Sequence, residues 1–217
     1  LAIQGPKSDG LMKRVFGDKI VNLKFFSFDY YNFRGVNYMI SKSGFSKQGG
    51  YEIYIENIES GLDLYDYFLD IGKDYNLKPG CPNAIERIEG ALLSYGNDMD
   101  IKDNPFECGF DKYIDLESKI DFLGKKSLKK IKAKGINRKL MGVKIKINEI
   151  NLTKEEKLFD KNNKVVGFLR SAAFSPKFKK VVGIAMINQK YWDASNEFQM
   201  KIDNKVTTGE ICSLPMI

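Results

Sequence analysis

The chain of 217 residues contains no histidine. This absence excludes, within this segment, histidine-based catalytic triads, histidine-ligated metals and a histidine general base. Any chemistry carried here must therefore rest on carboxylates, tyrosines, backbone groups and a bound cofactor.

Cysteine is scarce as well, with only Cys81, Cys108 and Cys212, and no C-x-x-C pair. An odd number of unpaired cysteines is typical of a reducing compartment and argues against a zinc or disulfide framework. We expect each of the three to be a small core residue rather than a nucleophile, and we expect no metal.

Long apolar runs are missing. No run approaches the roughly 18 residues that cross a bilayer, and no basic-then-apolar leader opens the chain. The expectation is a cytoplasmic protein without a membrane partner. The chain begins with Leu1-Ala2-Ile3 instead of Met, which resembles a buried strand entered partway. We therefore expect an N-terminally truncated fragment, inactive and poorly soluble when expressed alone.

The net charge of +7 is unevenly distributed. Residues 1–133 carry 19 Lys and Arg against 20 Asp and Glu, whereas residues 134–217 carry 16 against 8. A basic region of this kind can bind nucleic acid, but aromatic side chains are not interleaved with the basic ones in a recognisable motif. We therefore expect no nucleic-acid partner.

The most informative stretch is a glycine-containing loop that runs into an alternating strand. Residues 43–54 read Ser-Gly-Phe-Ser-Lys-Gln-Gly-Gly-Tyr-Glu-Ile-Tyr. Side chains of a strand alternate between its faces, so Glu52 and Tyr54 should share one face. The glycines that are free to take positive φ here are Gly44, Gly49 and Gly50.

A carboxylate and a phenol beside a glycine loop suit a flat polar heterocycle. The carboxylate of Glu52 would accept paired N–H donors, and the aromatic rings would stack or close the pocket. The same residues also fit an edge hairpin with a solvated face. The pattern alone leaves both interpretations open.

Periodicity divides the chain into a mixed region, residues 1–134, and a strand-rich region, residues 135–217. In the first region, helical spacing appears at 11–16, 61–75 and 83–94, and the aromatic run 25–31 is typical of a strand buried on both faces. In the second, alternation predicts a small antiparallel barrel. Its five predicted strands are 140–147, 164–169, 181–187, 198–202 and 210–214.

These pieces together resemble the folate-dependent aminomethyltransferases, the glycine cleavage T-protein family, across essentially the whole chain and in the same order. The motifs that carry the resemblance are 1–6 (Leu-Ala-Ile-Gln-Gly-Pro), 43–54, 87–98 (Arg87-Ile88-Glu89 to Asn97-Asp98), 104–109, 122–125, 140–143, 166–168, 175–176 and 183–185. The resemblance implies an α+β fold, with folate-binding domains followed by a small C-terminal barrel.

The resemblance also implies tetrahydrofolate as cofactor, with Glu52 and Tyr54 lining the pterin pocket and Phe45 stacking near the folate or the substrate. We expect Arg87 to tie its helix to Glu89 or to the Asp98 loop. The family's active-site aspartate precedes the position of Leu1, so no catalytic residue is expected in this segment. We also expect a homodimer.

Within the superfamily, the sequence of residues 43–50, 78–83 and 169–172 resembles that of the dimethylsulfoniopropionate demethylases. Phe45 stands where that family has a tryptophan, so ring area and an indole N–H are lost. Glycine-cleavage enzymes usually carry Ala-Arg-Asp at the start of the helix where this chain has Asn83, and the arginine contacts folate.

The implied reaction is methyl transfer from a small-molecule sulfonium to N5 of tetrahydrofolate. A sulfonium methyl is already activated, so such a reaction needs little acid–base catalysis and much positioning. Two alternatives stay open: an aminomethyltransferase or amine demethylase, and a non-catalytic folate-binding accessory protein, whose cysteine-containing signature is not found here.

Overall fold

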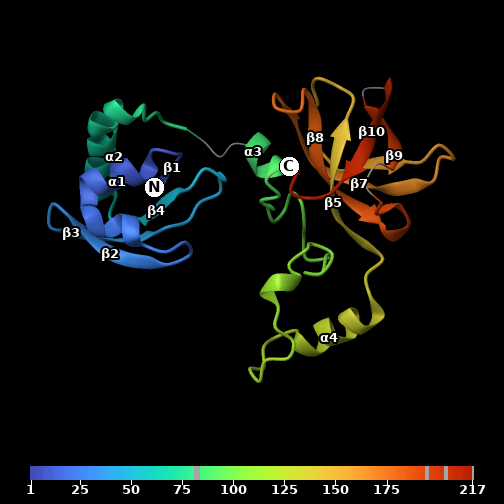
Figure 1. Ribbon diagram of the computed structural model, residues 1–217, viewed down its shortest axis with the longest axis horizontal. Coiled ribbons are helices and arrows are strands. Elements are labelled where there is room, and N and C mark those ends of the chain that lie inside the picture. Colours follow the sequence, from blue (N-terminus) through green and yellow to red (C-terminus); the bar gives the residue numbers. More distant parts are fainter. Residues whose placement is uncertain (81–83, 194–195, 203–204, 217) are drawn as a thin grey trace. The chain divides into compact units, whose positions relative to one another are not determined.

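The computed structural model of the chain describes residues 1–80, 84–193, 196–202 and 205–216. The chain forms two compact units, Leu1–Asn83 and Ala84–Ile217 (Figure 1). We call them the N-terminal unit and the barrel unit. Helices and a sheet in the first, and a closed barrel in the second, confirm the predicted α+β fold with a C-terminal antiparallel barrel.

The N-terminal unit is built on a four-stranded antiparallel sheet of order β1-β4-β3-β2. Its strands are β1 (Ala2–Gln4), β2 (Phe28–Phe33), β3 (Val36–Ser41) and β4 (Gly50–Tyr54). The register aligns Glu52 of β4 with Ala2 of β1 and Ser41 of β3. The loop between β3 and β4 is the glycine-containing stretch singled out in the sequence.

Helices cover one face of this sheet. They are α1 (Ser8–Phe16), the 3-10 turn η1 (Asp18–Asn22), α2 (Ile58–Ile71) and the 3-10 turn η2 (Gly72–Tyr75). Local chemistry sets the helix ends: the side chain of Asn57 accepts the Ser60 N–H at 3.0 Å to cap α2, and Gly17 ends α1 at φ 84°. Leu11 and Leu64 pack with the buried side of the sheet in one core.

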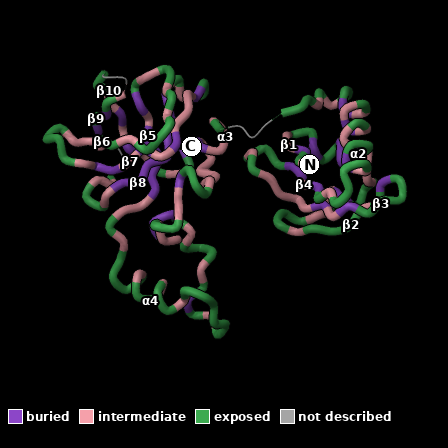
Figure 2. The backbone as a smooth tube through the Cα atoms, turned by 180° about the vertical axis from the view of Figure 1, so that it is seen from behind, coloured by how far each residue is buried: buried purple, intermediate pink, exposed green. Residues whose placement is uncertain are grey.

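The other face of the sheet is open, and this overturns the prediction that residues 25–31 are buried on both sides. Phe28 and Tyr30 of β2 are 60% and 63% exposed, and Figure 2 shows β2 mostly in the colour of exposed residues. β2 is an edge strand with helices behind it only, so alternate aromatic side chains project from the open face.

The barrel unit closes six antiparallel strands in the order β10-β5-β8-β7-β6-β9. They are β5 (Arg138–Ile145), β6 (Glu156–Phe159), β7 (Val165–Ser175), β8 (Lys180–Asn188), β9 (Glu197–Ile202) and β10 (Lys205–Cys212). Each of the five predicted strands overlaps an observed one. The sixth, β6, was not predicted, because four residues show too little alternation.

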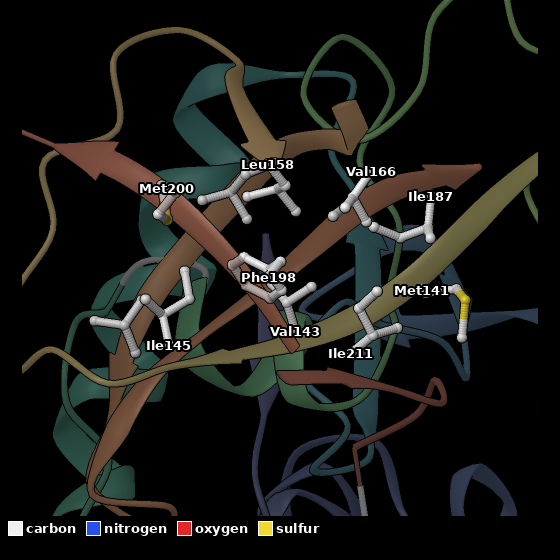
Figure 3. Close-up of a cluster of buried hydrophobic side chains, with 12 residues drawn as sticks. Met141, Val143, Ile145, Leu158, Val166, Ile187, Phe198, Met200 and Ile211 are labelled. Atoms are coloured by element: carbon white, nitrogen blue, oxygen red, sulfur yellow. The ribbon is translucent and has the colours of Figure 1, made fainter. Parts of the chain in front are cut away.

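Apolar side chains from all six strands fill the barrel interior (Figure 3). Val143, Leu158 and Phe198 lie at its centre and are almost fully buried. The single tryptophan, Trp192, packs against this core and donates its indole N–H to the Ile187 carbonyl at 2.9 Å.

Short helices accompany the barrel. They are α3 (Ala84–Glu89), η3 (Asp111–Tyr113), α4 (Lys125–Lys134) and η4 (Gln189–Tyr191). Ile88 of α3 packs on the outer side of the barrel against Val182 and Ile184 of β8. The helix predicted for 83–94 ends earlier, at Glu89, and Asn83 lies outside the described residues.

Among the described residues, no helix is both long enough and apolar enough to cross a membrane.

Candidate functional site

β4 presents its side chains in the predicted alternation. Tyr51 and Ile53 are buried against the helices, whereas Glu52 is half-buried on the open face and Tyr54 is 50% exposed there. The period of two that was read from the sequence therefore places Glu52 and Tyr54 together, as predicted.

The Glu52 carboxylate is held by serines of the neighbouring strand and loop. The Ser43 hydroxyl donates a short hydrogen bond to Glu52 Oε2, and Ser43 Oγ is hydrogen-bonded to Ser41 Oγ at 2.7 Å. To the residues that the structure describes, Glu52 Oε1 makes no hydrogen bond. One carboxylate oxygen is thus oriented by the protein and the other is free to accept a ligand donor.

Gln4 fastens the loop that carries Ser43. Its Nε2 donates to the carbonyl of Ser43 at 3.0 Å and to that of Tyr51 at 3.3 Å, and its Oε1 accepts the Ser46 hydroxyl at 2.7 Å. A side chain from β1 therefore fixes both ends of the loop, and through Ser43 it sets the position of Glu52.

The loop glycines serve two different purposes. Gly49 and Gly50 have φ values of 76° and 149°, as predicted, so a side chain there would be strained. Gly44 does not have a positive φ, which corrects the prediction for this residue. A Cβ at Gly44 would overlap the carboxamide of Gln4, so glycine is needed here because the Gln4 side chain approaches the backbone closely.

Aromatic side chains occupy the rest of the open face. Tyr54, Met39 and Tyr30 form one row across adjacent strands, and Phe28 lies one row away with its ring centroid 6.4 Å from that of Tyr30. Phe45, on the loop, is 38% exposed. The face thus combines a serine–carboxylate end with an aromatic end, and sequence reasoning missed Phe28 and Tyr30 because it assigned them to the core.

A second network lies behind β4. The Tyr51 hydroxyl donates to Asp9 at 2.6 Å, and Lys42 Nζ lies 3.2 Å from Asp9. The hydrogen bond from Tyr51 lowers the pKa of Asp9, and burial raises the pKa of Tyr51. Asp9 of α1 is therefore a charged hydrogen-bond acceptor that holds β4, the strand that carries Glu52, against α1.

In the barrel unit, Arg87 of α3 is committed to structural contacts. Its Nη1 lies 2.7 Å from Asp98 Oδ2 and its Nη2 3.0 Å from Ser171 Oγ. Asp98 is fully buried and also accepts the Ser94 N–H at 2.7 Å. The predicted tie between Arg87 and the Asp98 loop is confirmed; Glu89 instead accepts the Ser175 hydroxyl.

Sequence reasoning missed a larger ion-pair network in the same unit. Asp103 binds Arg170 at 2.5 Å and Arg138 at 3.0 Å, and Arg138 also binds Glu107 at 2.9 Å. Burial raises the pKa of Asp103, but the Arg170 hydrogen bond and the two guanidinium charges outweigh it and leave the pKa below its usual value. The network joins β5 and β7 to the segment after α3.

The described cysteines behave as core residues. Cys108 is buried, and burial raises the pKa of its thiol to about 11; burial also raises the pKa of Cys212. Cys81 lies outside the described residues. Within the described ranges, no three acidic, cysteine or histidine side chains gather as a metal site.

Comparison with known proteins assigns the family. The model of the GCVT N-terminal domain matches residues 1–118, and that of the glycine cleavage T-protein C-terminal barrel domain matches residues 138–217. The chain belongs to the glycine cleavage T-protein family. The predicted division between residues 134 and 135 stays a prediction; the compact units of the structure, Leu1–Asn83 and Ala84–Ile217, divide at a different position.

Relatives in this family are similar over most of the chain. A dimethylsulfoniopropionate demethylase of Ruegeria pomeroyi is 40% identical over 192 residues, which cover 88% of this chain and 52% of the relative. An aminomethyltransferase of Thermoanaerobacter sp. is 33% identical over 216 residues, which cover 98% of this chain and 58% of the relative. The chain thus spans about half the length of the curated relatives it matches.

A solved T-protein structure has the same fold. The glycine cleavage system aminomethyltransferase T of Bartonella henselae aligns with a TM-score of 0.86 at 21% identity and covers all of this chain and 58% of that one. The family's architecture therefore contains both units seen here.

Proposed function

We propose that the protein catalyses tetrahydrofolate-dependent demethylation of dimethylsulfoniopropionate, moving a methyl group from the sulfonium to N5 of tetrahydrofolate and leaving 3-(methylthio)propionate. The observation that carries the proposal is the Glu52 carboxylate, oriented by Ser43 on an open sheet face beside Tyr54. The 40% identity to a demethylase of this name supports the choice of donor.

The open face fits the chemistry of a reduced pterin. A pterin presents adjacent N–H donors along one edge, and Glu52 offers a carboxylate with one oxygen already oriented and the other free. Glu52 would hold the pterin edge, and Tyr54 would line the same pocket. Tetrahydrofolate, when bound, supplies the nitrogen that accepts the methyl group.

The aromatic end of the face suits a cationic substrate. A sulfonium carries its positive charge on a polarisable centre, which the face of a phenyl or phenol ring attracts. Phe45 and Tyr54 are exposed enough to present their rings to such a cation. We assign to these two residues the placement of the sulfonium, with Phe45 in the position of the family's tryptophan.

For this reaction, the residues need to orient the reactants and exclude water more than they need to transfer protons. The N5 lone pair forms the new bond to the methyl carbon, and the bond from carbon to the positive sulfur breaks with its electron pair going to sulfur. No proton has to reach the leaving group, and the proton that N5 carried is released to water. Alignment of donor and acceptor can contribute several kcal/mol to lowering the barrier. A segment without histidine is compatible with that role.

An aminomethyltransferase is the second candidate. The Thermoanaerobacter relative of that name matches 98% of this chain, more than the 88% matched by the demethylase. Such an enzyme would use the same Glu52 contact to the pterin, so the two candidates differ in the donor and not in the cofactor.

The test uses the intact protein expressed from its whole reading frame. It is mixed with tetrahydrofolate and dimethylsulfoniopropionate, and 5-methyltetrahydrofolate is measured by liquid chromatography. Product formation that is lost in Glu52→Ala and kept in Glu56→Gln, an exposed glutamate just beyond β4, supports the proposal. Folate binding without product would redirect the donor assignment, and the absence of folate binding would refute both candidates.

A further inference from the structure

The N-terminal unit contains a cavity of about 380 Å³ at the C-terminal end of β1. It lies between the turn from β1 to α1 and the segment that follows η2. None of Glu52, Tyr54 and Phe45 lines it. Gln4, which fastens the Ser43 loop, does line it. The other lining residues used below are Ile3, Lys7, Ser8, Leu11, Tyr75, Leu77 and Lys78.

The inner wall of the cavity is apolar and rigid. Ile3 and Leu11 are buried core residues, and Tyr75 completes the wall. Tyr75 packs over Gly10 of α1, where a Cβ would lie only 3.0 Å from its ring. Arg14 of α1 binds Asp74 of η2 at 2.7 Å, so the two elements that flank the cavity are tied together.

A serine whose hydroxyl bonds no described residue lines this cavity. Ser8, the first residue of α1, retains 7% of its exposure and lines the cavity. Its backbone N–H bonds to the Gly5 carbonyl, but its hydroxyl makes no hydrogen bond to any residue that the structure describes. The hydroxyl therefore has both its donor and its acceptor capacity open for a group bound in the cavity.

The mouth of the cavity carries uncompensated positive charge. Lys7 and Lys78 are exposed at its edge, and within the described ranges neither forms an ion pair. The nearby carboxylates are already engaged, Asp9 with Lys42 and Asp74 with Arg14. The N-terminal end of α1 adds the partial positive charge of its dipole.

We propose that this cavity binds an organic anion: a carboxylate with a short apolar chain, whose head group meets Ser8, Lys7 and Lys78 and whose chain lies against Ile3, Leu11 and Leu77. An apolar wall without the charges would take a neutral hydrocarbon, and charges without the wall would take an inorganic ion. Their combination selects a molecule that has both parts. The proposal does not depend on folate chemistry.

The experiment titrates the ¹⁵N-labelled intact protein with hexanoate and, separately, with hexanol, and follows amide shifts by NMR. Saturable shifts at Ser8 and Leu77 with hexanoate, and weaker binding of hexanol, are expected. In the double variant Lys7→Gln/Lys78→Gln, the dissociation constant should rise about tenfold or more, because hydrogen bonds to charged groups are lost. The control Lys19→Gln, an exposed lysine of η1, should leave it unchanged.

Ser8→Ala provides a second variant that keeps the charges and should weaken hexanoate binding about threefold to tenfold. Absence of saturable shifts at these amides, equal binding of hexanol, or indifference to both variants would each overturn the proposal. Glu52→Ala should not change hexanoate binding, so failure here and failure of the folate reaction are told apart.

Discussion

The Glu52 carboxylate is useful to a ligand only if it points in a fixed direction, and Ser43 supplies that direction. A ligand that pairs two donors with one carboxylate loses affinity when the carboxylate rotates, because side-chain ordering must then accompany binding. Ser43 acts through Glu52 and is therefore a positioning residue.

The first prediction follows from this. Ser43→Ala should raise the dissociation constant for tetrahydrofolate about threefold to tenfold and lower the thermal transition only slightly, because two part-buried hydrogen bonds, to Glu52 and to Ser41, are lost. Isothermal titration calorimetry measures the first and circular dichroism the second. Ser27→Ala, at a serine whose hydroxyl bonds the Lys24 carbonyl away from Glu52, is the matched control. An equal loss in both variants would contradict the role of Ser43.

Asp98 illustrates the cost of breaking a buried pair. Removing its carboxylate leaves the Arg87 guanidinium buried without a counter-charge. Asp98→Ala should therefore lower the free energy of unfolding by about 3–5 kcal/mol, measured by urea denaturation. Asp18→Ala, which removes an exposed pair with Lys13, should cost less than about 1 kcal/mol. Comparable losses in the two variants would show that burial does not control the effect.

The Asp103 network makes stability depend on pH. A carboxyl group whose pKa is lower in the folded chain stabilises the fold above its unfolded pKa, near ~3.9, and this contribution is lost as the pH falls through the folded value. The free energy of unfolding of the barrel unit should thus decline below about pH 4. Asp103→Asn should be less stable at pH 7 and show a shallower decline; a parallel decline would contradict this assignment.

Among the elements, α2 depends on the residue that precedes it, Asn57. Asn57 accepts the Ser60 N–H and satisfies a donor that the helix cannot satisfy itself. Asn57→Ala should lower the free energy of unfolding by about 1 kcal/mol, and Asn57→Asp should restore it, both measured by urea denaturation. If Asn57→Asp were as destabilising as the alanine variant, capping would not be the cause.

Element types were largely predictable from the sequence where a simple period dominates. Alternation placed Glu52 and Tyr54 on one face. Five of the six barrel strands were predicted as well, among them β8, which is buried on both sides and has a continuous apolar run. The prediction failed at β6, which is too short, and at β2, where aromatic composition suggested burial. Composition does not reveal that a sheet has helices behind one face only.

For the candidate site, the sequence predicted the shared face of Glu52 and Tyr54 but not the contacts that hold Glu52. That Ser43 orients Glu52, and that Gln4 holds the Ser43 loop, depends on the register of β1 against β4. The partners Gln4 and Ser43 are 39 residues apart in the chain. Pairing at that separation leaves no local pattern, and the same holds for the contact between Asp103 and Arg170.

At the scale of the whole molecule, each unit has its own core. Leu64 lies in the core of the N-terminal unit and Leu158 in that of the barrel, and the two clusters share no residue. Units with separate cores can unfold in separate transitions.

The last prediction tests this separation by scanning calorimetry. Leu64→Ala and Leu158→Ala should each lower the stability of their own unit by about 2–5 kcal/mol. Each variant should shift one component of the melting profile and leave the other in place. A single transition that moves equally in both variants would show that the chain unfolds as one cooperative body.

The position of Trp192 confines the tryptophan fluorescence of the chain to the barrel unit. Because the chain has one tryptophan and it packs on the barrel core, fluorescence excited near the red edge of indole absorption reports the barrel alone. The open face around Glu52 carries no tryptophan and gives no fluorescence at this excitation wavelength. Replacing Phe45 by tryptophan would place a fluorophore beside the proposed pterin pocket, so that ligand entry could be followed as quenching.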